Sequence, residues 1–200
     1  MSLNFCNNNS LSAITALPAS ISGGGLNLIS TQTASSSSTI SFTSGIDSTY
    51  KEYIFKFINI HSSADAPLTF NMSVDGGSNY NVTKTTTAFL AYHAEDDGSP
   101  ALGYEAGRDI AQGTGFQDIS YDIDNVDDGS TSGFLHLFDP SNTTFVKHFI
   151  ATANTQFPTA YSGNYFSAGY GNTTSAVDAV QFKLSSGTMD SGVIKLYGVS

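Results

Sequence analysis

The chain has 200 residues, enough for one domain with a sizeable core, and its 7 Lys and Arg against 17 Asp and Glu give a formal net charge of -10. This charge repels nucleic-acid phosphates and anionic lipids, so the composition argues against direct binding to nucleic acid or to a membrane. Charged residues are only 12% of the chain and Trp is absent, while Gly, Ser, Thr and Asn are abundant, which disfavours long helices and predicts a mainly β fold.

The single cysteine, Cys6, excludes an intrachain disulfide, so folding needs no oxidising compartment. No apolar run approaches the roughly 20 residues needed to span a bilayer, and the N-terminus lacks the basic and apolar regions of a signal peptide. We therefore expect a soluble protein that is made in a cytoplasm.

Residues 1–25 are predicted to be an assembly arm rather than part of the domain. They are rich in Asn and Ser and end in three consecutive glycines, which suit a hinge. Their apolar residues are too sparse to form a core, and we expect them to be buried on a neighbouring subunit: Leu11, Ile14, Leu17 and Ile21. The predicted domains are thus the arm, 1–25, and a β-sandwich, 26–200.

Short strands are predicted at 26–30 and 39–42, before the longest run of aromatic and β-branched residues, 46–60. We interpret 46–60 as one long central strand. Its side chains are expected to alternate, with Tyr53, Phe55 and Phe57 on one face and Ile54, Lys56, Ile58 and Ile60 on the other. Apolar residues on both faces are typical of a strand inside a two-layer sandwich.

Residues 68–74 alternate as a half-buried strand, and the Asp-Gly-Gly-Ser turn at 75–78 predicts a hairpin with 79–83 as the returning strand. Residues 85–93 favour a further strand. An acidic turn at 95–100 then leads into short strands and loops.

The second half predicts strands at 116–121, 134–138, 144–152, 165–170, 179–184 and 193–199, separated by turns rich in Gly, Asn and Asp. The terminal strand is expected to pair with an early one. Short strands at intervals of roughly 8 to 15 residues, without helices, predict an all-β, antiparallel β-sandwich, jelly-roll-like, with an extended N-terminal arm.

The densest group of acidic residues offers oxygens of the kind that bind Ca²⁺, at Asp122, Asp124, Asp127 and Asp128. The stretch lacks the sixth-position Gly and the closing Glu of a helix-loop-helix calcium site, so we favour a solvated acidic loop.

The four histidines, His61, His93, His136 and His148, are too dispersed for a zinc signature. His136 lies in an apolar strand, where a hydrogen-bonded histidine in the core or at an interface is favoured. No nucleophile elbow, zinc-protease, phosphate-loop or dinucleotide motif occurs, so no catalytic residue and no cofactor is predicted. Paired carboxylates for glycoside hydrolysis stay open as a less favoured alternative.

Tyr161, Tyr165 and Tyr170 are candidates for stacking on sugars, as aromatic side chains do in jelly-roll lectins. Strand alternation explains the same tyrosines as core and sheet surface, and we favour that interpretation.

Several segments carry a resemblance to a known family: Ile29 to Ser35, Ile46 to Tyr53, Asp75 to Tyr80, Leu135 to Phe138 and Gly192 to Gly198. Over about residues 26–200 the chain resembles virion structural proteins of tailed bacteriophages, especially marine ones. The most specific of these motifs is the Ile-Asp-Ser-Thr-Tyr-Lys-Glu-Tyr entry to the aromatic strand. The resemblance implies a jelly-roll-like subunit of a capsid or tail, with no enzymatic residues to carry over.

These observations lead us to expect a non-enzymatic phage virion structural protein, either a capsid decoration (cement) protein or a tail or fibre component. The alternative is a carbohydrate-binding, receptor-binding jelly-roll module of a tail fibre. Expected partners are other virion proteins and further copies of the chain in a homo-oligomer, with a trimer favoured, because exposed sheet edges need covering. The expected location is the virion, assembled in the host cytoplasm.

Overall fold

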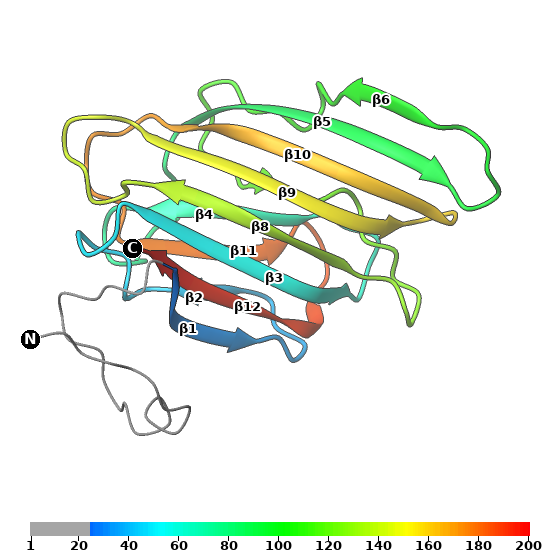
Figure 1. Cartoon of the computed structure of the whole chain (residues 1–200), viewed down its shortest axis with the longest axis horizontal. Coiled ribbons are helices and arrows are strands. Elements are labelled where there is room, and N and C mark those ends of the chain that lie inside the picture. Colours follow the sequence, from blue (N-terminus) through cyan, green and yellow to red (C-terminus); the bar gives the residue numbers. More distant parts are fainter. Residues whose placement is uncertain (1–24) are drawn as a thin grey trace, which may run out of the picture.

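The computed structural model describes residues 25–200, and in this range every regular element is a β-strand (Figure 1). The strands form two antiparallel sheets that pack face to face, so the predicted β-sandwich is confirmed. The apolar residues of the predicted arm, Leu11, Ile14, Leu17 and Ile21, lie outside the described residues.

The larger sheet has eight strands. In spatial order they are β1 (Leu26–Thr33), β12 (Met189–Val199), β3 (Glu52–Ser62), β8 (Thr131–Phe138), β9 (Lys147–Phe157), β10 (Tyr161–Gly171), β5 (Lys84–Ala94) and β6 (Ala101–Tyr104). The last strand, β12, lies between β1 and β3, which confirms that the terminal strand pairs with early ones.

The smaller sheet has four strands and covers one face of the larger sheet. In spatial order they are β2 (Ile40–Phe42), β11 (Ala179–Leu184), β4 (Leu68–Ser73) and β7 (Gln117–Asp118). Because only one face of the large sheet is covered in this way, its other face remains without a partner layer in the described chain.

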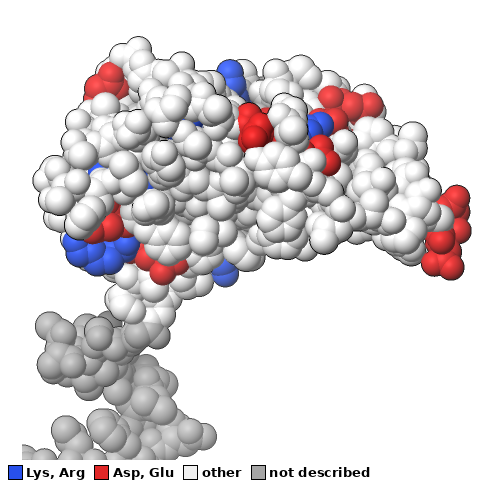
Figure 2. All heavy atoms as spheres, turned by 90° about the horizontal axis from the view of Figure 1, so that it is seen from above, with Lys and Arg blue, Asp and Glu red and all other residues white. Residues whose placement is uncertain are grey.

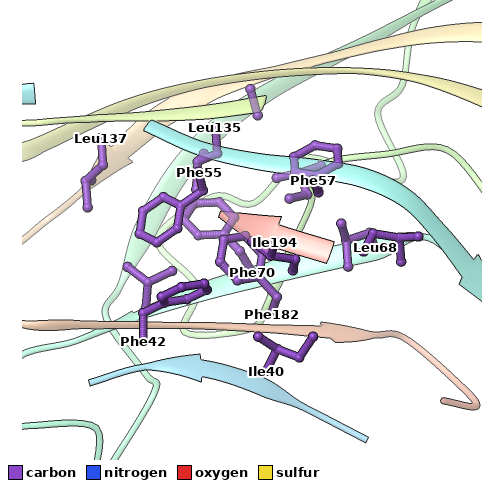
Figure 3. Close-up of a cluster of buried hydrophobic side chains, with 14 of the residues drawn as sticks. Ile40, Phe42, Phe55, Phe57, Leu68, Phe70, Leu135, Leu137, Phe182 and Ile194 are labelled. Atoms are coloured by element: carbon purple, nitrogen blue, oxygen red, sulfur yellow. The ribbon is translucent and has the colours of Figure 1, made fainter. Parts of the chain in front are cut away.

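The core lies between the two sheets and is built mainly from phenylalanine and aliphatic side chains (Figure 3). Phe55 of β3 is fully buried, with its ring centroid 5.3 Å from that of Phe42 and 5.2 Å from that of Phe182 in the small sheet. Phe70 and Phe149 make a similar edge-to-face contact across the layers at 4.8 Å. These rings join the two sheets, because each contact takes one ring from either layer.

The central strand differs from the predicted 46–60 at both ends. It begins at Glu52, with residues 46–51 forming a loop, and it continues to Ser62. Tyr53, Phe55 and Phe57 share the core face as expected, but Ile60 joins them there instead of lying with Ile54. The cause is an irregularity at Asn59, whose φ is 49° and where the register with β8 shifts between Phe57 and Ile60. Such a bulge reverses the alternation that the sequence suggested.

The predicted hairpin of 68–74 with 79–83 is wrong. Gly76 and Gly77 have the positive φ expected of the turn, but residues 79–83 form no strand. Strand β4 pairs with β11 along its whole length and with β7 at Thr69 and Phe70, and the returning segment meets β4 through a single backbone hydrogen bond, from the Val82 amide to the Met72 carbonyl at 3.4 Å. The turn instead leads the chain into the large sheet, where β5 pairs with β10.

Candidate functional site

The face of the large sheet that points away from the small sheet, here called the outer face, is rich in apolar side chains. Most of the exposed large apolar residues of the described chain lie on it: Leu26, Leu28, Ile58, Phe89, Leu102, Tyr104, Phe134 and Ile150. The three others, Val74, Val126 and Phe145, lie in loops. The outer face arises because β3 and β8 carry apolar residues at both alternate sets of positions, while β9 and β10 add Ile150, Phe166 and Tyr170 among polar residues.

Aromatic side chains form ordered pairs along the outer face. Phe89 of β5 stacks on Phe166 of β10, with ring centroids 4.7 Å apart and an interplanar angle of 13°. On β8, the His136 ring lies 5.1 Å from the Phe134 ring and 6.1 Å from the Phe138 ring. His136 is half-buried and hydrogen-bonds to Glu52 of β3, as expected for a bonded histidine. These pairs make the face stiff as well as apolar, since packed rings have few alternative rotamers.

Charged residues are only 12% of the chain, and on the side of the molecule that Figure 2 shows, wide uncharged areas separate them. On the outer face, Glu52 and Lys56 of β3 and Lys195 of β12 are the main ionisable groups besides histidine. A broad apolar surface with few charges is what a protein interaction surface requires, because little polar surface must be desolvated on binding.

The three tyrosines considered as an alternative sugar-stacking site are not brought together. Tyr165 is fully buried in a second, smaller apolar cluster with Ala88 and Leu90, so it presents no ring face to a sugar. Tyr161 stacks on Phe157 at 4.9 Å and 8°. Tyr170, at the far end of the same strand, lines a hollow of about 470 Å³ on the outer face together with Phe138, His148 and Ile150.

The four candidate calcium ligands, for which the sequence favoured a solvated acidic loop, have separate environments. Asp122 pairs with Arg108, and Asp124 accepts a hydrogen bond from the Val126 amide within its own turn. Asp127 and Asp128 are exposed. Among residues 25–200, no three His, Cys, Asp or Glu side chains are placed so that they could hold a metal ion together.

The sequence did not predict the ion-pair cluster that Arg108 forms with Asp118 and Asp122. The guanidinium donates to Asp118 at 2.9 Å and to Asp122 at 2.8 Å, and it lies over the Tyr121 ring at 4.2 Å. Burial raises the pKa of Asp118, and the charge of Arg108 opposes that rise only in part. Burial also disfavours the charged guanidinium, but Asp122 and Asp118 outweigh this effect and raise the pKa of Arg108. The cluster therefore depends on its single cation, which neutralises two partly desolvated carboxylates.

The sequence also did not predict that two lysines, Lys84 and Lys147, are fully buried. They are the first residues of β5 and β9, and both pair with Gly171 of β10. Lys84 Nζ donates to Asn71 Oδ1 at 2.6 Å and to the Val82 carbonyl at 2.8 Å. Lys147 Nζ donates to the Phe145 carbonyl at 2.7 Å. Burial lowers the pKa of Lys84 from 10.5 to about 8 and also lowers the pKa of Lys147. Sequence pattern could not reveal them, since lysine at alternate positions normally marks the solvent face.

The buried Lys84 predicts a pH-dependent stability. Its folded pKa of about 8 lies below the unfolded value, so from about pH 8 to about pH 10 the unfolded chain binds the extra proton and the free energy of unfolding rises with pH. Lys84→Met should remove up to about 1.4 kcal/mol per pH unit of this rise. Urea unfolding at a series of pH values measures it, with Lys183→Met as the control that keeps the slope. An unchanged slope in Lys84→Met would show that the amine is hydrated in solution.

Within residues 25–200 there is no helix long and apolar enough to cross a membrane. No protein-family model and no curated protein matches the chain.

Proposed function

We propose that this chain is a non-enzymatic structural subunit of a phage particle, a capsid decoration protein or a tail or fibre component, that assembles through its outer face. The observation that carries the proposal is the concentration of exposed apolar side chains on this one face of the large sheet. A sandwich that works alone usually exposes its outer faces as polar residues, because water then solvates one side of each sheet.

The size of the outer face suits a stable protein contact. Eight strands about 4.8 Å apart, up to 11 residues long at about 3.3 Å each, span on the order of 1,000 Å². A standard specific interface takes about 800 Å² from each partner. Fully covering one large apolar side chain contributes about 1.5–3 kcal/mol, so burying several of them offsets the cost of association.

The sheet edges support the same proposal. Strands β1 and β6 each have a partner on one side only within the described chain, which leaves unpaired backbone groups at both ends of the large sheet. Exposed edges favour further pairing, and repeated assemblies such as particles cover them with neighbouring subunits. The resemblance of residues 26–200 to virion structural proteins is the reason for proposing that this assembly is a phage particle.

The direct test is quantitative mass spectrometry of purified phage particles. A structural subunit should be present at a fixed copy number per particle, in simple ratio to the other structural proteins. Absence from the particles would overturn the proposal. If the chain were absent and the isolated protein bound sugars on a glycan array, the carbohydrate-binding alternative would replace it.

A further inference from the structure

Two lysines of the outer face, Lys56 of β3 and Lys195 of β12, lie directly opposite each other across the strand pair. Like charges at directly opposite positions destabilise a sheet. Lys56 and Lys195 therefore repel each other, and a negatively charged group that covers both of them would relieve this repulsion.

The other basic residues of the chain already have partners or are buried. Arg108 pairs with Asp118 and Asp122, and Lys51 pairs with Asp139. Lys84 and Lys147 are buried, and Lys183 lies over the Phe116 ring. Among residues 25–200, no carboxylate lies within 4.0 Å of Lys56 or Lys195.

The lysine pair is set in an apolar surround. Lys56 Nζ lies 5.5 Å from the centroid of the Tyr197 ring, and Lys56 is paired across the sheet with Phe134 of β8. Leu28 of β1 is the strand partner of Tyr197. Both lysines are half-buried. A carboxylate that docks here would be partly desolvated, which strengthens its attraction to the two cations.

The opposite end of the large sheet is acidic. Glu95, Asp96 and Asp97 are consecutive and exposed in the connection between β5 and β6. The Asp97 side chain is 98% exposed, and the His93 ring nitrogen lies 3.5 Å from its carboxylate. Figure 2 shows an acidic patch at the end of the molecule where Figure 1 places this connection.

The acidic connection and the lysine pair are too far apart to neutralise each other within one chain. Four strand spacings separate β3 from β5, about 19 Å, and β12 lies one strand further away. The Debye length at physiological ionic strength is about 8 Å, so charges at this separation are screened from each other. Neutralisation therefore requires a second molecule.

We propose that the outer face binds a second copy of this chain head to tail, with the connection of residues 95–97 in one copy docked on Lys56 and Lys195 of the next. The inference rests on the proposed assembly function and names its partner and orientation. General repulsion between two chains of charge -10 is reversed locally where three carboxylates meet two lysines. The contact joins different surfaces of the two copies, so repetition builds a ring if the rotation closes, the trimer being the ring we expect, and a filament if it does not.

Charge-swap variants of the full-length chain test this docking by sedimentation velocity. The wild type should associate at micromolar concentration and dissociate as salt rises. Lys56→Glu with Lys195→Glu should weaken self-association at least about tenfold, and so should Glu95→Lys with Asp96→Lys and Asp97→Lys. An equimolar mixture of the two swapped chains should associate again, because each supplies the charge that the other needs. Lys183→Glu, on the small sheet, is the matched control and should leave association unchanged.

Different failures have different meanings. Association that persists unchanged in both swapped chains overturns the docking, while presence of the chain in particles still upholds the proposed function. Wild-type protein that is monomeric at all concentrations also overturns it. A monomer whose Lys56 and Lys195 retain it on a heparin column would show that the pair binds an anionic polymer and not a second copy. Thermal melts of each variant, monitored by circular dichroism, identify any chain that lost association by unfolding.

Discussion

Replacing Arg108 with methionine is expected to lower the free energy of unfolding by about 3 kcal/mol at neutral pH. The substitution keeps an unbranched apolar side chain but removes the guanidinium from the Tyr121 ring and leaves Asp118 and Asp122 without their shared cation. Both carboxylates are mostly removed from water, with side-chain exposures of 19% and 33%, so their charges would be poorly solvated. Equilibrium urea unfolding measures the loss.

The pH dependence identifies the cause of that loss. The folded pKa of Asp118 is already above its ordinary value because of burial, and removing Arg108 should raise it further. Protonation then relieves the penalty, so the difference between variant and wild type should shrink as the pH falls toward about 4. Lys51→Met is the matched control, because Lys51 pairs with Asp139 at 3.0 Å but is 78% exposed. It should cost less than about 1 kcal/mol. Equal losses in the two variants would contradict the account of a desolvated cluster.

Phe55→Ala is the second substitution with a large expected effect, a loss of about 3–5 kcal/mol in the free energy of unfolding. Phe55 is fully buried in β3 and contacts Phe42 and Phe182 of the opposite sheet, so its removal leaves a cavity where the layers join. Neighbouring strands hold the backbone on both sides, which limits how far the cavity can collapse. Chemical denaturation gives the magnitude directly.

Phe145→Ala is the control, because it removes an aromatic ring that is not buried in the core. Phe145 is 68% exposed in the loop before β9, and its truncation should change stability by less than about 1 kcal/mol. A similar cost for Phe55→Ala and Phe145→Ala would mean that the sheets are not joined by the ring cluster of Figure 3.

Strand positions were predictable where alternation is regular and turns are rich in Gly, Asn and Asp. Phe55 and Phe57 lie in the core as the sequence indicated, and β12 pairs with early strands. The alternation of residues did not predict the bulge at Asn59, which places Ile60 in the core. The hairpin at 75–78 failed for a different reason: the turn residues specify a reversal locally, but which strand pairs with β4 is decided by the packing of both sheets.

The outer face was partly visible in the sequence, because the central stretch carries apolar residues at both alternate sets of positions. That pattern predicted burial on both sides, and one side is covered by the small sheet while the other meets no layer within the described chain. The Lys56 and Lys195 pair was not predictable, since it depends on the register between two strands more than a hundred residues apart. The Arg108 cluster and the buried Lys84 likewise depend on loops and strand ends that meet only in the folded chain.

The central claim, that a neighbouring subunit covers the outer face, is tested most directly by hydroxyl-radical footprinting of purified particles. The isolated chain, diluted until it is monomeric, is the reference. Phe89, Phe134 and Ile150 of the outer face are 41%, 38% and 50% exposed in the single chain, so each should be oxidised several-fold more slowly in the particle. Oxidation of all three at the same rate in the particle as in the monomer would contradict the account.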